Sequence, residues 1–553
     1  MTLNLKDERR CTGPRWRAAK SIAAFDDSDA PAKSLSIPLL PIWTMHGKAV
    51  MHGAGDARRH QRKVLECMSS KFAGKVELST GQSAWLLACA GPFIFLTALT
   101  LLALYGAPEH DDFCLAFQNV RDGFVQTVLQ FYTGLSGRIV PLLIIQIPAA
   151  VAKAAGSSIL PAYVATLIAF ALLFVAGSAF AMVRMWPTVR GPALLALMLG
   201  FPAAIAGATP SAHDLLYWLP GLACYVPPGL VTILILGECV YAIDREREFS
   251  NKATAWAVVG AFLSATCNEF TAIWLVAILA ASLLGRYAFS QKLQVGRHFM
   301  IAAAAVIGWL IVAAAPGNGQ RMAAADGGWD LSFSIREGLR FALIGLRTLL
   351  LSPSLIGWLV LVVAISTATP APEKQDGRRE KWLAWGIVAL CLGCCYFEYF
   401  LHQLVTGSHL VDRAQNQALI LIVFGFTLCA ALLARVYRRQ LREKLAFGGA
   451  AISLDKPVWP LLLTAIIAIS LYFSTTGSRL RRERATFGPF WQEAVARDRL
   501  LASRPDQVVD VPRHRWKPST LISADINDNI GCVAMYYHNK ELIPVDQQGG
   551  SSQ

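Results

Sequence analysis

Long apolar runs alternate with short polar connections over most of this chain. Each run approaches the roughly 20 apolar residues that a helix needs to cross the hydrocarbon core of a bilayer. The pattern predicts eleven membrane-spanning helices, at about 84–106, 159–183, 191–209, 225–243, 253–268, 270–285, 298–315, 340–366, 384–405, 416–434 and 458–476. The fifth and sixth are short and could together form one bent or re-entrant element. We therefore expect an all-α polytopic membrane protein.

Three regions follow from the positions of these runs. Residues 1–83 are polar and basic and show no signal-peptide pattern, which predicts a disordered cytoplasmic segment. Residues 84–476 hold every predicted span, and 477–553 predict an amphipathic helix followed by a small packed lid. The apolar stretch 138–153 is short for a span and carries two prolines, so it is predicted to lie along the membrane interface.

Basic residues indicate the orientation of the chain. They gather in alternate connections, at 184–190, 244–252, 286–297, 373–381 and 435–444. Because Lys and Arg in short loops stay on the cytoplasmic side, these connections are predicted to be cytoplasmic. The first span then leads outward. The intervening connections and the C-terminal segment are predicted to face the outside of the inner membrane, which is the periplasm in a Gram-negative cell.

Composition supports this class of protein. The chain is 54% hydrophobic and 16% charged, with a mean hydropathy of +0.44. Its net charge of +14 comes mainly from residues between apolar runs, so it does not indicate nucleic-acid binding. Many of the twelve cysteines behave as small buried hydrophobic residues rather than a disulfide framework, including Cys89, Cys239, Cys391, Cys394, Cys395 and Cys429. The CxxCC group at 391–395 lacks His or acidic partners, which argues against a zinc site.

Polar and aromatic residues gather in the predicted outer connections. Directly after the first span the chain reads APEHDDFC (107–114), in which His110, Asp111 and Asp112 are adjacent. A solvated acidic loop is the simplest interpretation of this stretch alone. The other outer connections, however, add His213, Asp214, Tyr217, Trp218, Glu269, Asn318, Arg321, the Ser408-His409 pair and Arg413. Such a collection on one face of an apolar scaffold favours an active site at the membrane surface.

The order of these groups resembles the GT-C class of integral membrane glycosyltransferases. The resemblance rests on the acidic pair and Phe113 directly after the first span, an amphipathic stretch, Gly137-Arg138, Tyr217-Trp218, Glu269 and PGN with Arg321. It implies a GT-C-like bundle whose first outer loop carries interfacial helices. It also implies a polyprenyl-phosphate sugar donor, a glycan or glycolipid acceptor and inverting transfer in one step. The chain differs from better-known members in its long basic N-terminus and its short C-terminal segment.

Sugar transfer to a hydroxyl needs a general base, and Asp111 or Asp112 is the candidate. Two carboxylates in a low-dielectric cleft raise the proton affinity of at least one of them, or create a site for a divalent cation such as Mg²⁺ or Mn²⁺. No other cofactor is indicated. His110 could orient the pair, although a histidine in a loop is more often solvated.

The departing phosphate needs a cationic partner at the membrane boundary. Arg138, Arg321 and Arg413 are the candidates, because guanidinium groups contact phosphates through two parallel hydrogen bonds. PGNGQR (316–321) is the strongest, since its glycines allow backbone N–H groups to face a phosphate. The same sequence is equally typical of a turn that ends a span. Arg138 could instead extend to the interface, and Arg413 could pair with Asp412.

The remaining candidates would bind sugar. Tyr217 and Trp218, with His213 and Asp214, could stack on a sugar ring, although Trp and Tyr at a membrane boundary more often form an interfacial belt. Glu269 lies between two short spans and is a candidate for binding sugar or positioning an arginine.

Two other functions compete with transfer. A transporter or flippase of a lipid-linked or amphipathic solute would bury charges at mid-membrane and show internal repeats. The ionisable residues instead fall mainly at span ends, and no repeat is evident. A non-catalytic envelope assembly factor would not need Asp111 and Asp112.

Overall fold

A computed structural model describes residues 80–324, 330–369, 377–444, 458–523, 525 and 530–545. These residues all belong to one compact unit. The prediction for residues 1–83 falls almost entirely outside them.

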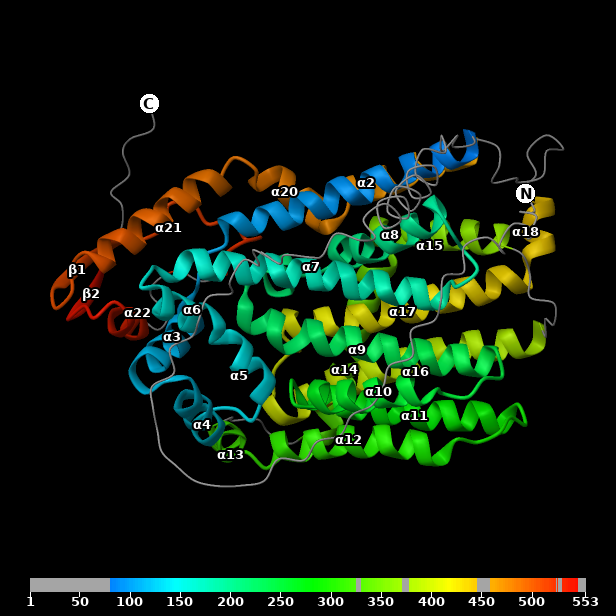
Figure 1. Ribbon diagram of the computed structural model, residues 1–553, viewed down its shortest axis with the longest axis horizontal. Coiled ribbons are helices and arrows are strands. Elements are labelled where there is room, and N and C mark those ends of the chain that lie inside the picture. The colour runs from blue at the N-terminus through cyan, green and yellow to red at the C-terminus, as the bar shows by residue number, and fades with distance from the viewer. Residues whose placement is uncertain are drawn as a thin grey trace, which may run out of the picture. The chain divides into compact units, whose positions relative to one another are not determined.

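Helices build nearly all of this unit, which confirms an all-α polytopic membrane protein (Figure 1). In the described ranges, seven helices are long and apolar enough to cross a membrane, or up to nine if each of two bent pairs is one span. The seven are α2 (Thr80–Leu102), α7 (Ile159–Met185), α9 (Leu219–Asp244), α11 (Glu269–Ala288), α12 (Val295–Ala313), α16 (Gly377–Thr406) and α17 (Asp412–Val436). Two further predicted spans form the shorter helices α8 (Pro192–Ala208) and α10 (Asn251–Ala265). The count of eleven stays a prediction.

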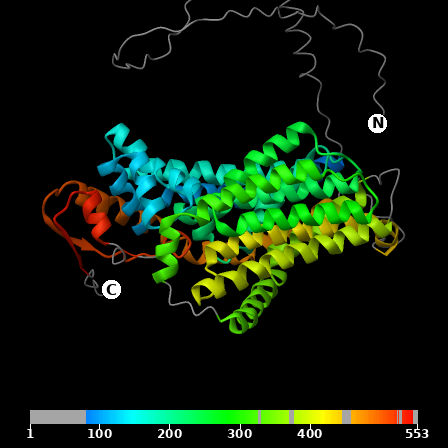
Figure 2. The same ribbon diagram turned by 90° about the horizontal axis from the view of Figure 1, so that it is seen from below.

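The predicted span 340–366 is wrong as a single helix. The chain forms α14 (Leu331–Leu350) and α15 (Pro353–Ala368), which meet at 63°. Pro353 explains the break, because proline has no N–H to continue a helix but suits the first turn of a new one. Figure 2 shows α14 lying obliquely to the main helices. The last predicted span is likewise bent, at 61°, between α19 (Val458–Tyr472) and α20 (Thr475–Glu483).

Short helices occupy the connection between α2 and α7, at one end of the bundle (Figure 1). They are η2 (Ala103–Tyr105), α3 (His110–Asp122), α4 (Phe124–Gly134), α5 (Ile139–Ile145) and α6 (Ile147–Ala155). The stretch predicted to be interfacial forms α5 and α6, which pack on α9 and on α7 and α3 respectively. A further short helix, α13 (Pro316–Ala324), lies against α4, while α18 (Arg438–Lys444) follows α17 at the opposite end.

The C-terminal segment forms a small packed unit against α3. After α20 it comprises α21 (Phe487–Ala502), β1 (Val508–Pro512), α22 (Ile530–Tyr536) and β2 (Glu541–Val545), with β1 and β2 paired in parallel so that Val509 faces Leu542. Phe113 of α3 packs against the rings of Tyr536 and Tyr537. We call residues 487–545 the C-terminal cap.

A disulfide joins the cap to α3, between Cys114 and Cys532. The expectation that the cysteines serve only as buried hydrophobic residues is therefore wrong for this pair. It holds for the six cysteines of the apolar runs, which are buried free thiols.

Replacing both Cys114 and Cys532 by serine should loosen the cap. The bond closes a loop of more than 400 residues, and a disulfide typically contributes about 2–4 kcal/mol. Faster amide hydrogen exchange in α22 than in the wild type would report the loss. Peptide mapping without reductant should recover the two cysteines in one cross-linked species. Unchanged exchange in the double variant would show that packing alone holds the cap.

Candidate functional site

Helix α3 begins with a capping box that Glu109 and Asp112 form. Glu109 is the N-cap residue; its backbone N–H donates to Asp112 Oδ2 at 2.9 Å, and its side chain accepts from the backbone N–H of Asp112. Successive residues of a helix point about 100° apart. Asp112 therefore lies buried, with 4% of its surface exposed, whereas Asp111 is half-buried. The two carboxylates lie in different surroundings.

Asp112 is held in a largely apolar setting. Its Oδ2 also accepts a hydrogen bond from the Tyr163 hydroxyl at 3.0 Å. Its Oδ1 is buried and has no hydrogen-bond partner among the described residues. Burial raises the pKa of Asp112 to about 8; the backbone hydrogen bond at Glu109 opposes this rise, and the Glu109 charge adds to it. Asp112 is thus mostly protonated at neutral pH.

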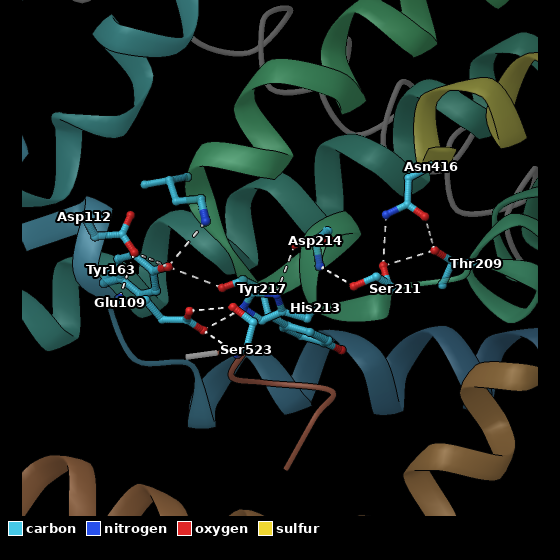
Figure 3. Close-up of polar contacts among 11 residues, drawn as sticks. Glu109, Asp112, Tyr163, Thr209, Ser211, His213, Asp214, Tyr217, Asn416 and Ser523 are labelled. Atoms are coloured by element: carbon cyan, nitrogen blue, oxygen red, sulfur yellow. Dashed lines mark hydrogen bonds and ion pairs between the residues drawn. The ribbon is translucent and has the colours of Figure 1, made fainter. Parts of the chain in front are cut away.

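Glu109 joins three segments that are far apart in sequence (Figure 3). His213 lies in the π-helical turn η3 (His213–Tyr217), and its Nε2 is 2.6 Å from Glu109 Oε1, while its Nδ1 is 3.1 Å from Asp214 Oδ1. The backbone N–H and the hydroxyl of Ser523 donate to Glu109 at 3.0 and 2.9 Å. Burial lowers the pKa of His213, but its hydrogen bonds to Asp214 and Glu109 outweigh this and raise it to about 9. His213 is therefore an imidazolium between two carboxylates.

These side chains do not fit a bound Mg²⁺ or Mn²⁺ at the acidic pair. One oxygen of Asp112 already accepts two hydrogen bonds, and the carboxyl group is mostly protonated at neutral pH. Across the described ranges, no three His, Cys, Asp or Glu side chains converge in a way that could hold a metal ion. We derive no step through a cation.

Arg138 and Glu269 form a second polar group. Arg138 precedes α5, and its Nη2 lies 2.9 Å from Glu269 Oε2 at the start of α11. Its guanidinium carbon is 6.0 Å from the centre of the Tyr225 ring. Asn318 accepts a hydrogen bond from Gly137 N at 3.3 Å, which ties α13 to the residue before the arginine. Two roles were predicted for Glu269, binding sugar and positioning an arginine. Its contact with Arg138 favours the second.

The aromatic pair splits between two roles. Tyr217 is 1% exposed and its hydroxyl donates to the Leu99 carbonyl of α2 at 2.8 Å, so it serves packing. Trp218 stacks on His213 at 6.0 Å with ring planes 14° apart. The guanidinium carbon of Arg413 lies 5.1 Å from the centre of the Trp218 ring, a cation–π contact. Trp218 thus contacts two cationic groups.

The PGNGQR sequence does not form the predicted phosphate-binding turn. It begins the helix α13, and a side chain at Gly317 would meet the backbone of Leu135 and Ser136. This glycine allows α13 to approach the end of α4 closely. The side chains of Arg321 in α13 and His110 in α3 lie outside the described residues, so their roles stay predictions.

A cavity of about 520 Å³ lies beside this polar region, between α14, α16 and α17. Most of its lining is apolar, with His409, Gln415 and Arg479 among its polar members. His409 packs 3.6 Å from the ring of Phe341, whereas the neighbouring Ser408 hydroxyl bonds to Thr406. Pro210, three residues before His213 of η3, also lines the cavity, so the cavity extends to the start of η3. We call this space the α14–α17 cavity.

Two adjacent amides at the start of α17 fix the helix ends around the site. Asn416 bonds to Thr209, at the end of α8, and to Ser211 (Figure 3). Gln417 accepts from Asn268 at 3.0 Å and donates to Thr271 at 2.8 Å, which anchors the start of α11.

Sequence reasoning missed several residues of this site, namely Glu109, Tyr163, Arg479 and Ser523. Only Glu109 could have been recognised from the local sequence. It lies three residues before Asp112, which is the spacing of the two residues of a capping box. The others reach the site from distant segments.

No protein-family model, curated protein or solved structure matches this chain. The fold and the site together define a polytopic helical membrane protein with a buried carboxylate and histidine cluster at one end, and any function must be argued from that geometry.

The contact between Glu109 and His213 should depend on pH. Because the folded-state pKa of His213 is about 9 and its ordinary value is 6.5, its stabilisation is complete below pH 6.5 and is lost as the pH rises through 9. His213→Gln should therefore loosen the cap at pH 6 by roughly 3 kcal/mol, and have little effect at pH 9.5. Hydrogen exchange near Ser523 measures this difference.

Asp112→Asn supplies the control. The pKa of Asp112 is raised on folding, so its ionisation costs stability progressively from about pH 4 to 8. The asparagine variant should lose that decline and keep the one that His213 causes between about pH 6.5 and 9. If His213→Gln changed hydrogen exchange near Ser523 equally at pH 6 and pH 9.5, His213 would not be a protonated imidazolium in the folded protein.

Proposed function

We propose that this protein is a glycosyltransferase of the GT-C type. It transfers a sugar from a polyprenyl-phosphate donor to an envelope glycan or lipid-linked acceptor, on the outer side of the inner membrane. The observation that carries the proposal is the α14–α17 cavity, which joins an apolar lining to a polar part with Arg479 and extends to Pro210, just before η3. A donor with a hydrocarbon chain and a charged, sugar-bearing head requires that combination.

The donor phosphate is assigned to Arg479. This side chain lines the polar part of the cavity, where the head of a lipid lying in the apolar part would be. Arg138 is less suited, because it is not among the described residues that line this cavity. Arg413, stacked on Trp218, is the second cationic side chain near this end. As the sugar leaves, negative charge grows on the phosphate and a guanidinium stabilises it.

Asp111 is assigned as the general base. The acceptor hydroxyl oxygen attacks the anomeric carbon while its proton passes to the Asp111 carboxylate. The bond from that carbon to the phosphate oxygen breaks, and its electron pair leaves with the phosphate. Asp112 is buried and bonded to Glu109 and Tyr163, so we assign it to holding the start of α3, which positions Asp111.

Two features support an outer location for the site. The disulfide between α3 and the cap lies beside the carboxylate cluster, and such bonds persist in oxidising compartments. The opposite end of the bundle carries the basic α18 and the arginines that begin α16, as expected for a cytoplasmic side.

One observation favours the transporter alternative. Glu398 lies within α16, is fully buried, and neither carboxylate oxygen has a hydrogen-bond partner in the part of the chain that the structure describes. Ionisable groups inside a membrane often serve proton or solute pathways. In a transferase, Glu398→Gln should leave turnover within about threefold, because the isosteric amide keeps the packing and the residue takes no part in transfer. In a proton-coupled transporter the same change should abolish flux into proteoliposomes.

Asp111→Asn should lower turnover by roughly 100-fold or more, because it removes the base at constant size. Thermal unfolding is the control for the fold, because Asp111 lies outside the capping box that begins α3. Steady-state kinetics in nanodiscs with a polyprenyl-phosphate hexose give the measurement. Asp112→Asn is the matched comparison and should alter stability and its pH dependence more than the chemical step. Near-normal turnover of Asp111→Asn would show that Asp111 is not the general base.

Arg479→Ala should reduce kcat/KM for the donor by roughly 30- to 1000-fold, the loss expected when one charge-stabilising donor is removed. The kcat/KM of Arg479→Lys should lie between the values of the wild type and Arg479→Ala, because lysine keeps the charge without the planar contact. Arg347→Ala, at an exposed position of α14 outside the cavity lining, is the control for net charge. Equal values of kcat/KM for the donor in Arg479→Ala and Arg347→Ala would show that the donor phosphate does not bind at Arg479.

A further inference from the structure

A second cavity, of about 660 Å³, lies at the opposite end of the bundle, between α9, α11 and α16. Its walls are the second halves of α9 and α11 and the first turns of α16, at the end of the bundle that carries α18 (Figure 1). The lining is apolar along most of its length, for example at Leu236, Ile278, Leu284 and Ile387. Arg378 and Arg379 close one end. We call this space the α11–α16 groove.

Exposed aromatic residues mark the level of the membrane interface there. Trp382 and Trp385 of α16 are 66% and 61% exposed, and Tyr287 of α11 is 74% exposed. Exposed Trp and Tyr at helix ends gather at the level of lipid headgroups. The two arginines come one helical turn before Trp382, at or just beyond that level. From Arg378 to Leu390 the groove follows roughly 18 Å of helix, close to one leaflet of a hydrocarbon core about 30 Å thick.

Arg378 and Arg379 bring two positive charges to one end of the groove. No carboxylate occurs among the described residues that line the groove. Glu246, which pairs with Arg379 from outside, keeps 68% of its side chain exposed. Arg379 also lies over the Phe289 ring at 5.4 Å, and this contact holds its guanidinium at the same end of the groove. Two arginines above a leaflet-deep apolar channel match the phosphate and acyl chain of a lipid.

We propose that the α11–α16 groove binds an anionic phospholipid, with an acyl chain along the apolar lining and the headgroup phosphate at Arg378 and Arg379. This site is independent of the transfer reaction, because it lies at the other end of the helices.

Two glycines of α16 provide a matched test. A Cβ atom added at Gly386 or at Gly393 would meet no atom within 4 Å, but of these two glycines only Gly386 lines the groove. Gly386→Phe should therefore block the apolar channel without disturbing the fold, and Gly393→Phe should not. Native mass spectrometry of purified protein in mixed micelles of phosphatidylglycerol and phosphatidylcholine counts the retained lipids. We expect the wild type and Gly393→Phe to retain phosphatidylglycerol, and Gly386→Phe to retain at least 10-fold less.

The arginines are tested separately. Changing both Arg378 and Arg379 to alanine should weaken the preference for phosphatidylglycerol over phosphatidylcholine by roughly 10- to 30-fold, from about 1 kcal/mol for each basic residue near a membrane surface. Changing Arg336 and Arg340, two exposed arginines of α14, to alanine removes the same charge elsewhere and should have no effect. Equal retention by the two phenylalanine variants would overturn the proposal. So would a wild type that retains both lipids equally, because the groove would then hold bulk lipid without recognising its charge.

Discussion

The buried carboxylate of Glu109 is the constraint on which the site depends. A charge removed from water is costly unless it is paired and fully hydrogen-bonded. Glu109 meets this requirement with the His213 imidazolium and two donors of Ser523. Because these partners come from η3 and from the C-terminal cap, one side chain fixes three segments around the start of α3. Asp112 is buried as a consequence, and its raised pKa follows from that burial.

The helices supply a rigid frame for this junction. α17 holds the ends of α8 and α11 through Asn416 and Gln417, and the disulfide fastens the cap to α3. The bend between α14 and α15 then turns α14 across α16.

The two ends of the bundle differ in chemistry. One end carries the carboxylates, the histidine, the disulfide and a cavity with a polar side. The other carries arginines above an apolar groove. A membrane imposes such a division, because charged groups gather where helices leave the hydrocarbon core and the two aqueous sides differ in redox conditions and lipid charge. The proposed transfer reaction and the proposed lipid site each use one end.

The sequence by itself determined the helical membrane class and the place of most long helices, because the length and hydropathy of a run are local properties. It also placed the acidic pair directly after the first long apolar run. It did not reveal that Asp111 and Asp112 point into different surroundings, since that depends on the helical phase and on what packs against each face. The pairing of Cys114 with Cys532 and the arrival of Ser523 and Arg479 at the site were decided by the tertiary structure. Each requires segments separated by tens to hundreds of residues to meet, and a pattern read along one chain carries no distance between them.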